Sequence, residues 1–162
     1  AIESGSRRIQ QTMQKRLNIS RCLENIEYSA RHGIFTNGFL MMGFPTETEE
    51  ELQQTGEVAC NSMLHTASFF TVTPFPGTEL HRIVMEQNPE RIANLHYDGI
   101  DYSSFRVNIS AVPDDVLFQC QRLANRRFYR NPYRLYRIVR DHPQRHLLPL
   151  YTGILLSRLR KR

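Results

Sequence analysis

Three short loops contain the residue types that could bind a small polar ligand. The first is Glu3–Ser6 (ESGS), where Glu3 places a carboxylate directly after a short apolar segment and Ser4 begins a run of small residues. A carboxylate accepts two hydroxyl hydrogen bonds, which suits the diol of a ribose, and small residues allow a ligand to approach the backbone. The same four residues could form a purely structural turn, and the tetrapeptide alone does not decide between the two.

The second loop, Gly43–Thr48 (GFPTET), follows an apolar run. Gly43 lets the backbone turn against a ligand, and Pro45 makes the loop rigid. The structural alternative is a capping box, in which Thr46 begins a helix and Glu49 lies three residues later. Both roles can hold at once.

The third loop, Thr73–Thr78 (TPFPGT), repeats this pattern after the next apolar run. Pro74 and a second proline fix a backbone whose N–H and C=O groups could pair with the edge of an adenine. Thr73 precedes them at the strand end, and Phe75 offers a ring face. A proline-rich turn that binds no ligand is the alternative.

The segments between these loops alternate between strand and helix patterns. Continuous apolar runs predict buried parallel strands, and apolar residues at helical spacing between capping signals predict helices. Strands are expected at 1–3, 34–42 and 68–73, and helices at 20–32 (with Ser20 as N-cap), 48–64 and 78–87. This order predicts an α/β fold, a βα-repeat with a parallel, sequentially ordered three-stranded sheet and its helices on one face. Ligands bind such sheets at the C-terminal strand ends, where all three loops fall.

Charge divides the chain into two parts. From Arg122 onward there are twelve basic residues against one acid, whereas the preceding residues hold nine basic and fifteen acidic ones. We therefore expect a barrel part at 1–87, an irregular connector at 88–112 and a basic helical extension at 113–162.

Cysteine usage and hydropathy indicate a cytoplasmic protein. Cys22, Cys60 and Cys120 are odd in number and far apart, which fits reduced thiols and neither a disulfide framework nor a metal knuckle. No signal-peptide pattern is visible, and the longest apolar tract, 147–156, is too short to span a bilayer.

Four motifs in a fixed order carry a resemblance to a known family. ESGS, RHGI at 31–34, GFPTET and TPFPGTEL at 73–80 together resemble the second half of a radical S-adenosylmethionine (radical SAM) enzyme. The resemblance covers about residues 1–87 and is strongest to the subgroup of magnesium-protoporphyrin monomethyl ester cyclase-like Fe–S oxidoreductases, which carry a cobalamin-binding domain. It implies that the chain supplies the fourth to sixth strands of a six-stranded, TIM-barrel-like partial barrel.

The resemblance also implies cofactor-binding roles. Glu3 and Ser4 would lie at the ribose of S-adenosylmethionine, and Lys15 or Arg16 would pair with its carboxylate. The residues that would flank the adenosyl group are Gly43, Pro45, Thr73, Pro74 and Phe75. A solvated surface is the alternative for the basic pair, and it is the interpretation we give to Arg7 and Arg8.

The motif that radical SAM enzymes need and this chain lacks is CxxxCxxC, whose cysteinates bind a [4Fe–4S] cluster. S-adenosylmethionine, the cluster and, in this subgroup, cobalamin are therefore implied for a longer parent, with the missing N-terminal half of the barrel as partner. The chain alone is expected to be inactive and to self-associate through an exposed apolar sheet edge. Neither a catalytic or metal-binding residue nor the substrate is indicated.

The basic extension suggests a competing, non-catalytic function. Its arginines at 126, 130, 134 and 137 are interleaved with tyrosines, a composition that could bind nucleic acid or a protein partner. Asn131 and Pro132 interrupt the helix, so these arginines need not share a face. Packing of the basic extension on the acidic body of its own chain is therefore favoured over nucleic acid.

Overall fold

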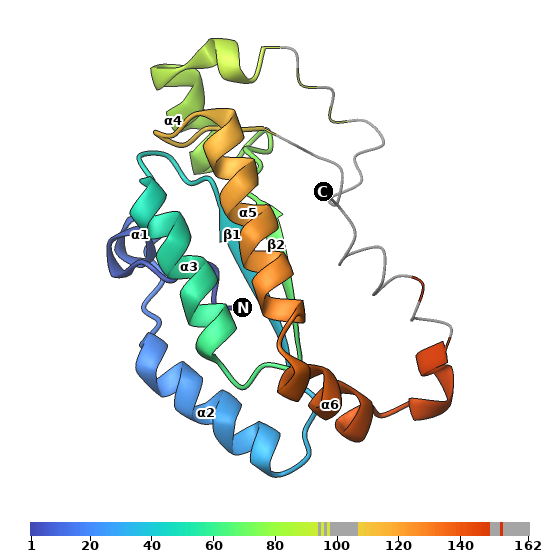
Figure 1. The fold of residues 1–162 in the computed structure, drawn as a ribbon. Coiled ribbons are helices and arrows are strands. Elements are labelled where there is room, and N and C mark those ends of the chain that lie inside the picture. Colours follow the sequence, from blue (N-terminus) through green and yellow to red (C-terminus); the bar gives the residue numbers. More distant parts are fainter. Residues whose placement is uncertain (94, 96, 98–106, 150–152, 154–162) are drawn as a thin grey trace.

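The structure is a computed structural model that describes residues 1–93, 95, 97, 107–149 and 153. It has the predicted α/β architecture, in which two parallel strands alternate with helices and further helices follow (Figure 1). The strands are β1, Asn37–Met42, and β2, Thr66–Thr71, with Leu40 opposite Phe69. Antiparallel pairing would have contradicted the barrel prediction, and the observed pairing is parallel.

The third predicted strand is reduced to a single contact. Glu3 forms an isolated parallel bridge with Leu40, so the order of the three segments along the sheet is sequential, as predicted. The pairing stops there because Glu3 has a φ of 67°, in the left-handed region, and turns the chain out of the extended conformation. The sheet of the described residues therefore has two strands instead of three.

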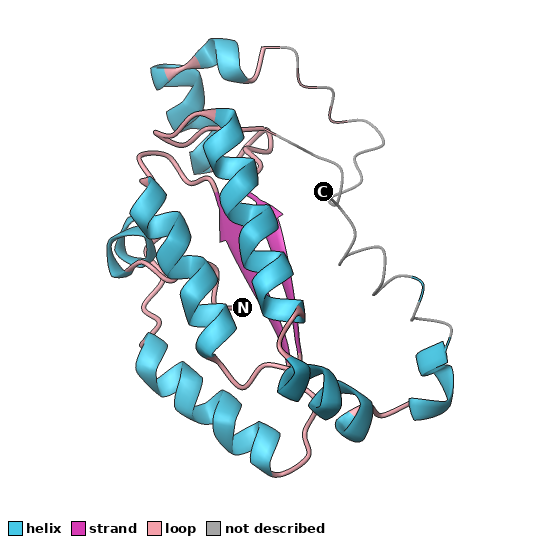
Figure 2. Ribbon diagram, in the orientation of Figure 1, coloured by secondary structure: helices cyan, strands magenta, loops and turns pink. Residues whose placement is uncertain are grey.

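Two helices cover one face of the sheet, as Figures 1 and 2 show. Helix α3, Glu49–Asn61, connects the strands, and helix α5, Asp114–Tyr129, lies beside it and along β2. Alternate residues of β1, among them Leu40 and Met42, are buried, as expected for a strand with one face against helices. The predicted extension thus contributes α5 to the main core.

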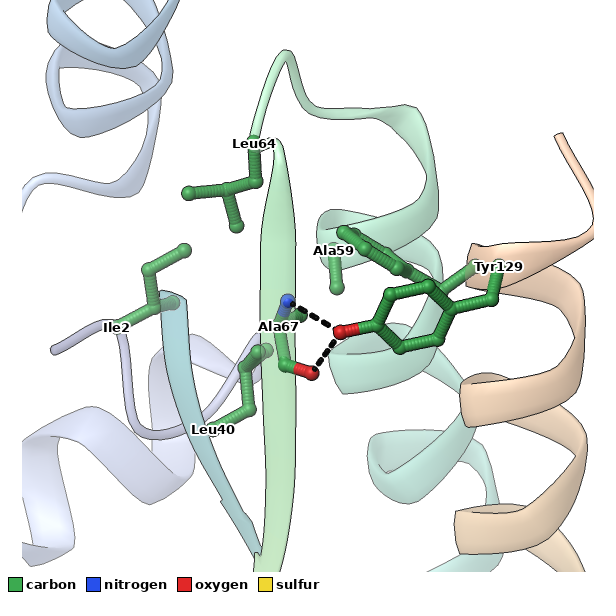
Figure 3. Packing of buried hydrophobic residues seen from close by; sticks show 7 residues of the cluster. Ile2, Leu40, Ala59, Leu64, Ala67 and Tyr129 are labelled. Carbon is green, nitrogen blue, oxygen red and sulfur yellow. Dashed lines mark hydrogen bonds between the residues drawn. The ribbon is translucent and has the colours of Figure 1, made fainter. Parts of the chain in front are cut away.

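Two side chains of α5 also form hydrogen bonds with the backbone at the outer edge of β2. Figure 3 shows the Tyr129 ring of α5 beside Ala67 and Ala59; Leu64 belongs to the same apolar cluster. The Tyr129 hydroxyl donates to the carbonyl of Ala67 at 2.9 Å and accepts its N–H at 3.2 Å, and Gln121 Nε2 donates to the carbonyl of Phe69 at 2.8 Å. These bonds occupy backbone groups through which another strand could pair. Self-association of the chain stays a prediction.

The prediction that three helices all cover one face is wrong in detail. Helix α4, Glu79–Gln87, lies beyond the C-terminal end of β2, and α5 takes the expected place along that strand. Pro74 and Pro76 restrict the backbone of the connecting loop to extended conformations, which carries α4 past the sheet. Helix α2, Ile19–Arg31, packs through Cys22 and Ile26 at the opposite end.

Several element boundaries differ from the prediction because side chains cap other positions. Asn18, and not Ser20, caps α2, and the capping box of α3 joins Thr48 to Glu51 in place of Thr46 to Glu49. Both strands are displaced or shortened by two or three residues. The remaining α-helices of the described chain are α1, Arg7–Thr12, and α6, Pro132–Asp141, with Asn131 as its cap.

Two short 3-10 helices, Pro89–Arg91 and Arg145–Leu147, complete the described chain. The end of the predicted basic extension, at 150–152 and 154–162, lies outside the described residues, and the predicted domain boundaries stay predictions. Over the residues that are described, no helix is both long and apolar enough to cross a bilayer.

Candidate functional site

The three loops singled out in the sequence leave the sheet at the same end, because the segments before them run parallel. Val72 donates its N–H to the carbonyl of Met42 at 2.9 Å, which continues the pairing to the strand ends. Ile9, Phe44 and Val72 then pack in one apolar cluster beneath the loops. This C-terminal end is where ligands bind in sheets of this class.

Glu3 and Lys15 meet at this end. Lys15 Nζ lies 3.1 Å from Glu3 Oε1 and also donates to the carbonyl of Ala1 at 2.8 Å. Both side chains are partly exposed. Lys15 and Arg16 line a groove of about 500 Å³ along α1, but only Lys15 reaches the carboxylate. Of the two basic residues that the sequence left open, the structure brings Lys15 to Glu3.

The remainder of ESGS packs against α3. Ser4 is fully buried, and its hydroxyl lies 3.3 Å from Thr55 Oγ1 and accepts the N–H of Ser6 at 3.1 Å. A Cβ on Gly5 would lie 2.6 Å from the backbone oxygen of Gln54. Only glycine allows this approach, so the small residues of the motif permit close contact between the loop and α3.

The Glu47 side chain folds back into its own loop. Its Oε2 accepts the N–H groups of Gly43 at 2.6 Å and Phe44 at 2.9 Å, while Gly43 has a φ of 96°. The side chain is fully buried, and burial raises its pKa from 4.5 to about 7 against the opposing effect of these two bonds. The other oxygen, Oε1, has no hydrogen-bond partner among the described residues.

An ion pair that the sequence analysis missed joins α1 to α3. Arg8 Nε donates to Glu51 Oε1 at 2.8 Å and Arg8 Nη2 to Oε2 at 2.5 Å, while Ser6 Oγ donates to Oε1 at 2.7 Å. Arg8 also donates to the hydroxyl and carbonyl of Thr46, at 2.9 and 2.8 Å. The bonds from Arg8 are the main reason that the pKa of Glu51 falls to about 2.

Arg8 is exposed, as the sequence analysis expected, but its side chain also forms this ion pair, which the analysis did not predict. Its partner Glu51 lies 43 residues away in the sequence. No local pattern at either residue could have indicated the contact, since it depends on how α1 and α3 pack.

The third loop contacts a different neighbour. The carbonyl of Pro74 accepts the Tyr97 hydroxyl at 2.9 Å, and the ring centroids of Phe75 and Tyr97 are 6.0 Å apart. The Thr73 hydroxyl lies 3.5 Å from the carbonyl of Thr71. These contacts hold the proline-rich loop against residue 97 of the connector.

A second groove, of about 550 Å³, lies between α1 and α4 and is lined by Met13, Pro45 and Leu80 among others. Neither this groove nor the one along α1 is lined by Thr73, Pro74 or Phe75. Convergence of all predicted cofactor-binding residues on one cleft stays a prediction.

The described residues do not fit an iron–sulfur cluster. Cys22, Cys60 and Cys120 are free thiols on three different helices. Within the described ranges, no three histidine, cysteine, aspartate or glutamate side chains are grouped so that they could hold a metal ion. The carboxylate of Glu3 and the ammonium group of Lys15 do fit the hydroxyl and carboxylate groups of an amino-acid nucleoside.

No family profile matches the chain. A cytidylyl-2-hydroxyethylphosphonate methyltransferase of Streptomyces wedmorensis is 34% identical over 94 residues, which make up 54% of this chain and 18% of the relative. An uncharacterised methyltransferase of Pyrococcus horikoshii is 31% identical over 87 residues, 54% of this chain and 19% of the relative. A tRNA-2-methylthio-N(6)-dimethylallyladenosine synthase of Mycobacteroides abscessus is 32% identical over 101 residues, 61% of this chain and 20% of the relative.

The chain thus spans about a fifth of the length of these curated relatives. The resemblance seen in the motifs is confirmed at this coarse level: the chain has distant, partial homology to radical SAM methyltransferases and methylthiotransferases.

Proposed function

We propose that this chain is part of a longer radical SAM enzyme and contributes the side of the site that holds the ribose and carboxylate of S-adenosylmethionine. The observation that carries the proposal is the contact between Glu3 and Lys15 at the C-terminal end of parallel strands, 3.1 Å between Oε1 and Nζ. The partial similarity to methyltransferases supports the same assignment.

The chemistry of this pair suits the cofactor. The Glu3 carboxylate has a second oxygen, Oε2, with which it can accept a ribose hydroxyl while Oε1 faces Lys15. The Lys15 ammonium group has three N–H donors, of which two point to Glu3 and to the carbonyl of Ala1. The third donor can meet the carboxylate of the cofactor. Ser4, whose hydroxyl is engaged in the interior, would act by shaping this loop.

The two proline-containing loops would flank the adenosyl group through Gly43, Pro45, Thr73, Pro74 and Phe75. Arg8 and Glu51 support this arrangement because their ion pair fixes the second loop to α1. When bound with its cluster, S-adenosylmethionine supplies a 5′-deoxyadenosyl radical, and the cluster ligands would come from outside this chain. Methyl or methylthio transfer is the reaction class that the names of the relatives favour. Cobalamin dependence belongs to the proposal as well.

Isothermal titration of S-adenosylmethionine into the full-length protein tests the binding role. Glu3→Ala and Lys15→Ala should each weaken binding roughly 5- to 150-fold, because each removes a hydrogen bond to a charged group worth about 1–3 kcal/mol. Arg16→Ala is the matched control and should leave the affinity within about twofold. Unchanged affinity in both Glu3 and Lys15 variants would overturn the assignment.

The gene sequence upstream of Ala1 provides a separate test of the enzyme class. A CxxxCxxC motif within about 100–150 residues, the span of a typical domain, is expected. A complete upstream reading frame without such a motif would contradict the class, whatever the binding experiment shows.

A further inference from the structure

The arginines of α5 and α6 fall into a buried and an exposed set. Arg134 and Arg137 are 2% and 1% exposed and donate to backbone carbonyls at the end of α3. Arg126, Arg130 and Arg140 are exposed. The sequence favoured packing of the basic extension against the rest of its own chain. Only the buried arginines have that role, and the exposed ones do not.

Two tyrosines on α6 are exposed beside these arginines. Tyr133 and Tyr136 lie one helical turn apart and are 57% and 59% exposed. The Arg137 guanidinium lies 5.5 Å from the ring centroid of Tyr133, and that of Arg140 lies 5.7 Å from the ring centroid of Tyr136. Each ring therefore lies within cation–π distance of a guanidinium, while much of its surface stays open to solvent.

The surroundings of these rings are strongly positive. Residues 122–147 contain eight arginines and a single acid, Asp141. The Asp141 side chain is only 7% exposed and is bound by Arg140 and His65, at 2.7 and 3.0 Å. The one negative charge of this region is thus withdrawn from the surface.

We propose that the surface formed by Arg126, Arg130, Tyr133, Tyr136 and Arg140, here called the Arg/Tyr surface, binds single-stranded nucleic acid. These residues follow one another along the end of α5, which stops at Tyr129, and along α6, which begins at Pro132. A short loop joins the two helices (Figure 2). Arginines meet backbone phosphates, and exposed aromatic rings stack on unpaired bases without sequence preference. A duplex offers no unpaired base faces, so single strands are the class of ligand that this chemistry fits. The proposal is independent of the radical SAM assignment.

Fluorescence anisotropy of labelled oligouridine and oligothymidine with the whole 162-residue chain tests it. The Tyr133→Leu/Tyr136→Leu variant should bind at least about fivefold more weakly than wild type, since stacking on each base is lost. The Tyr133→Phe/Tyr136→Phe variant keeps the rings and should bind like wild type. Tyr28→Leu, which alters a tyrosine 65% exposed on α2, is the control for loss of any surface ring.

Salt titration separates the arginines from the tyrosines. Each phosphate contact contributes about 0.7 to the slope of log affinity against log salt for single strands, so Arg126→Gln/Arg130→Gln should lower that slope by about 1.4. The leucine variant should leave the slope unchanged. The matched control, Arg7→Gln/Arg21→Gln, removes two exposed arginines elsewhere and should change neither the affinity for the oligonucleotide nor the salt slope.

Several results would overturn the proposal. They are absence of oligonucleotide binding at about 50 mM salt, equal binding by wild type and the folded leucine variant, or equally tight binding of a duplex of the same length. Binding to phosphatidylserine vesicles with the same arginine dependence, combined with no effect of the tyrosine changes on oligonucleotides, would assign the surface to anionic lipid instead. Circular dichroism of each variant establishes that it is folded.

Discussion

The two ends of the sheet use arginine in opposite ways. At the C-terminal end, Arg8 is half-exposed and pairs with one carboxylate, Glu51, and with the loop at Thr46. At the N-terminal end, Arg134 and Arg137 are almost completely buried and make five hydrogen bonds to carbonyls of residues 60–64, where α3 ends. Burial lowers the pKa of Arg134 to about 10.

The difference separates a candidate binding end from a structural end. Guanidinium groups at a helix C-terminus satisfy carbonyls that have no partner in the helix and interact favourably with its dipole. The C-terminal strand end instead holds three described non-glycine residues with positive φ, namely Glu3, Gln14 and Thr46. Such residues cost about 1–3 kcal/mol each and cluster at functional sites. In barrels the same division holds, with ligands at one face and stability at the other.

The largest expected effect is at the structural end. Arg134→Ala should destabilise the protein by about 3–5 kcal/mol, because it removes the guanidinium partner of the carbonyls of Cys60 and Ser62 in the interior and the stacking of the guanidinium on Phe128, 3.7 Å from the ring centroid. Urea unfolding followed by circular dichroism measures it.

Arg130→Ala is the matched control, since it removes an exposed arginine one turn earlier and should change the free energy of unfolding by less than about 0.5 kcal/mol. Equal effects of the two substitutions would remove the distinction between the two ends.

The next effect concerns pH at the binding end. Glu47 has a folded pKa of about 7, above its usual 4.5, so the folded state binds more protons than the unfolded state between these values. The stability that Glu47 contributes to the folded state is fully present below about pH 4.5 and is lost as the pH rises through 7. The free energy of unfolding of the wild type should therefore fall by about 1–3 kcal/mol between pH 5 and 8, and Glu47→Gln should abolish this decrease. Urea unfolding at each pH measures it. An identical pH profile in wild type and variant would contradict the raised pKa.

The structural end should respond to pH in the opposite direction. Burial lowers the pKa of His65, whose Nδ1 accepts the N–H of Thr36 at 3.0 Å while Nε2 faces Asp141. Arg137 and Arg140 also disfavour its protonation. The stability that His65 contributes is present above pH 6.5 and is lost as pH falls below that value. His65→Gln should reduce this loss of stability at low pH and leave the loss that Glu47 causes between pH 5 and 8 unchanged.

The regular elements were predictable because their signals are local. The apolar run before Gly43 and the capping signals of α3 each lie within a few residues, and both predicted elements formed. The interruption of the helix at Asn131 and Pro132 was equally local and is observed. Glu3 and Lys15 could be proposed together only through the order of several motifs. Caps were misassigned where two candidates lay two residues apart, as with Thr46 and Thr48, because tertiary packing chooses between them.

What the sequence could not indicate depends on contacts between distant segments. Arg8 with Glu51, Tyr129 with Ala67 and Arg134 with Leu64 join residues 43, 62 and 70 positions apart. The burial of Arg134 in particular contradicts the usual rule that arginine is exposed. Only the packing of α6 against the end of α3 reveals it.

The smallest expected effect is at Arg8. Arg8→Ala should destabilise the protein by about 1 kcal/mol, because the ion pair is half-exposed and solvent screens it. Its local effect should be larger than its global one, since the two bonds that tie Thr46 to α1 are lost and the second loop is freed. Native-state hydrogen exchange should therefore be faster at the Gly43 and Phe44 amides and unchanged in β2. Arg7→Ala, the neighbouring exposed arginine, should alter neither region. If Arg8→Ala instead lowered the free energy of unfolding as much as Arg134→Ala, with uniform exchange across the sheet, Arg8 would be a structural residue like those at the other end.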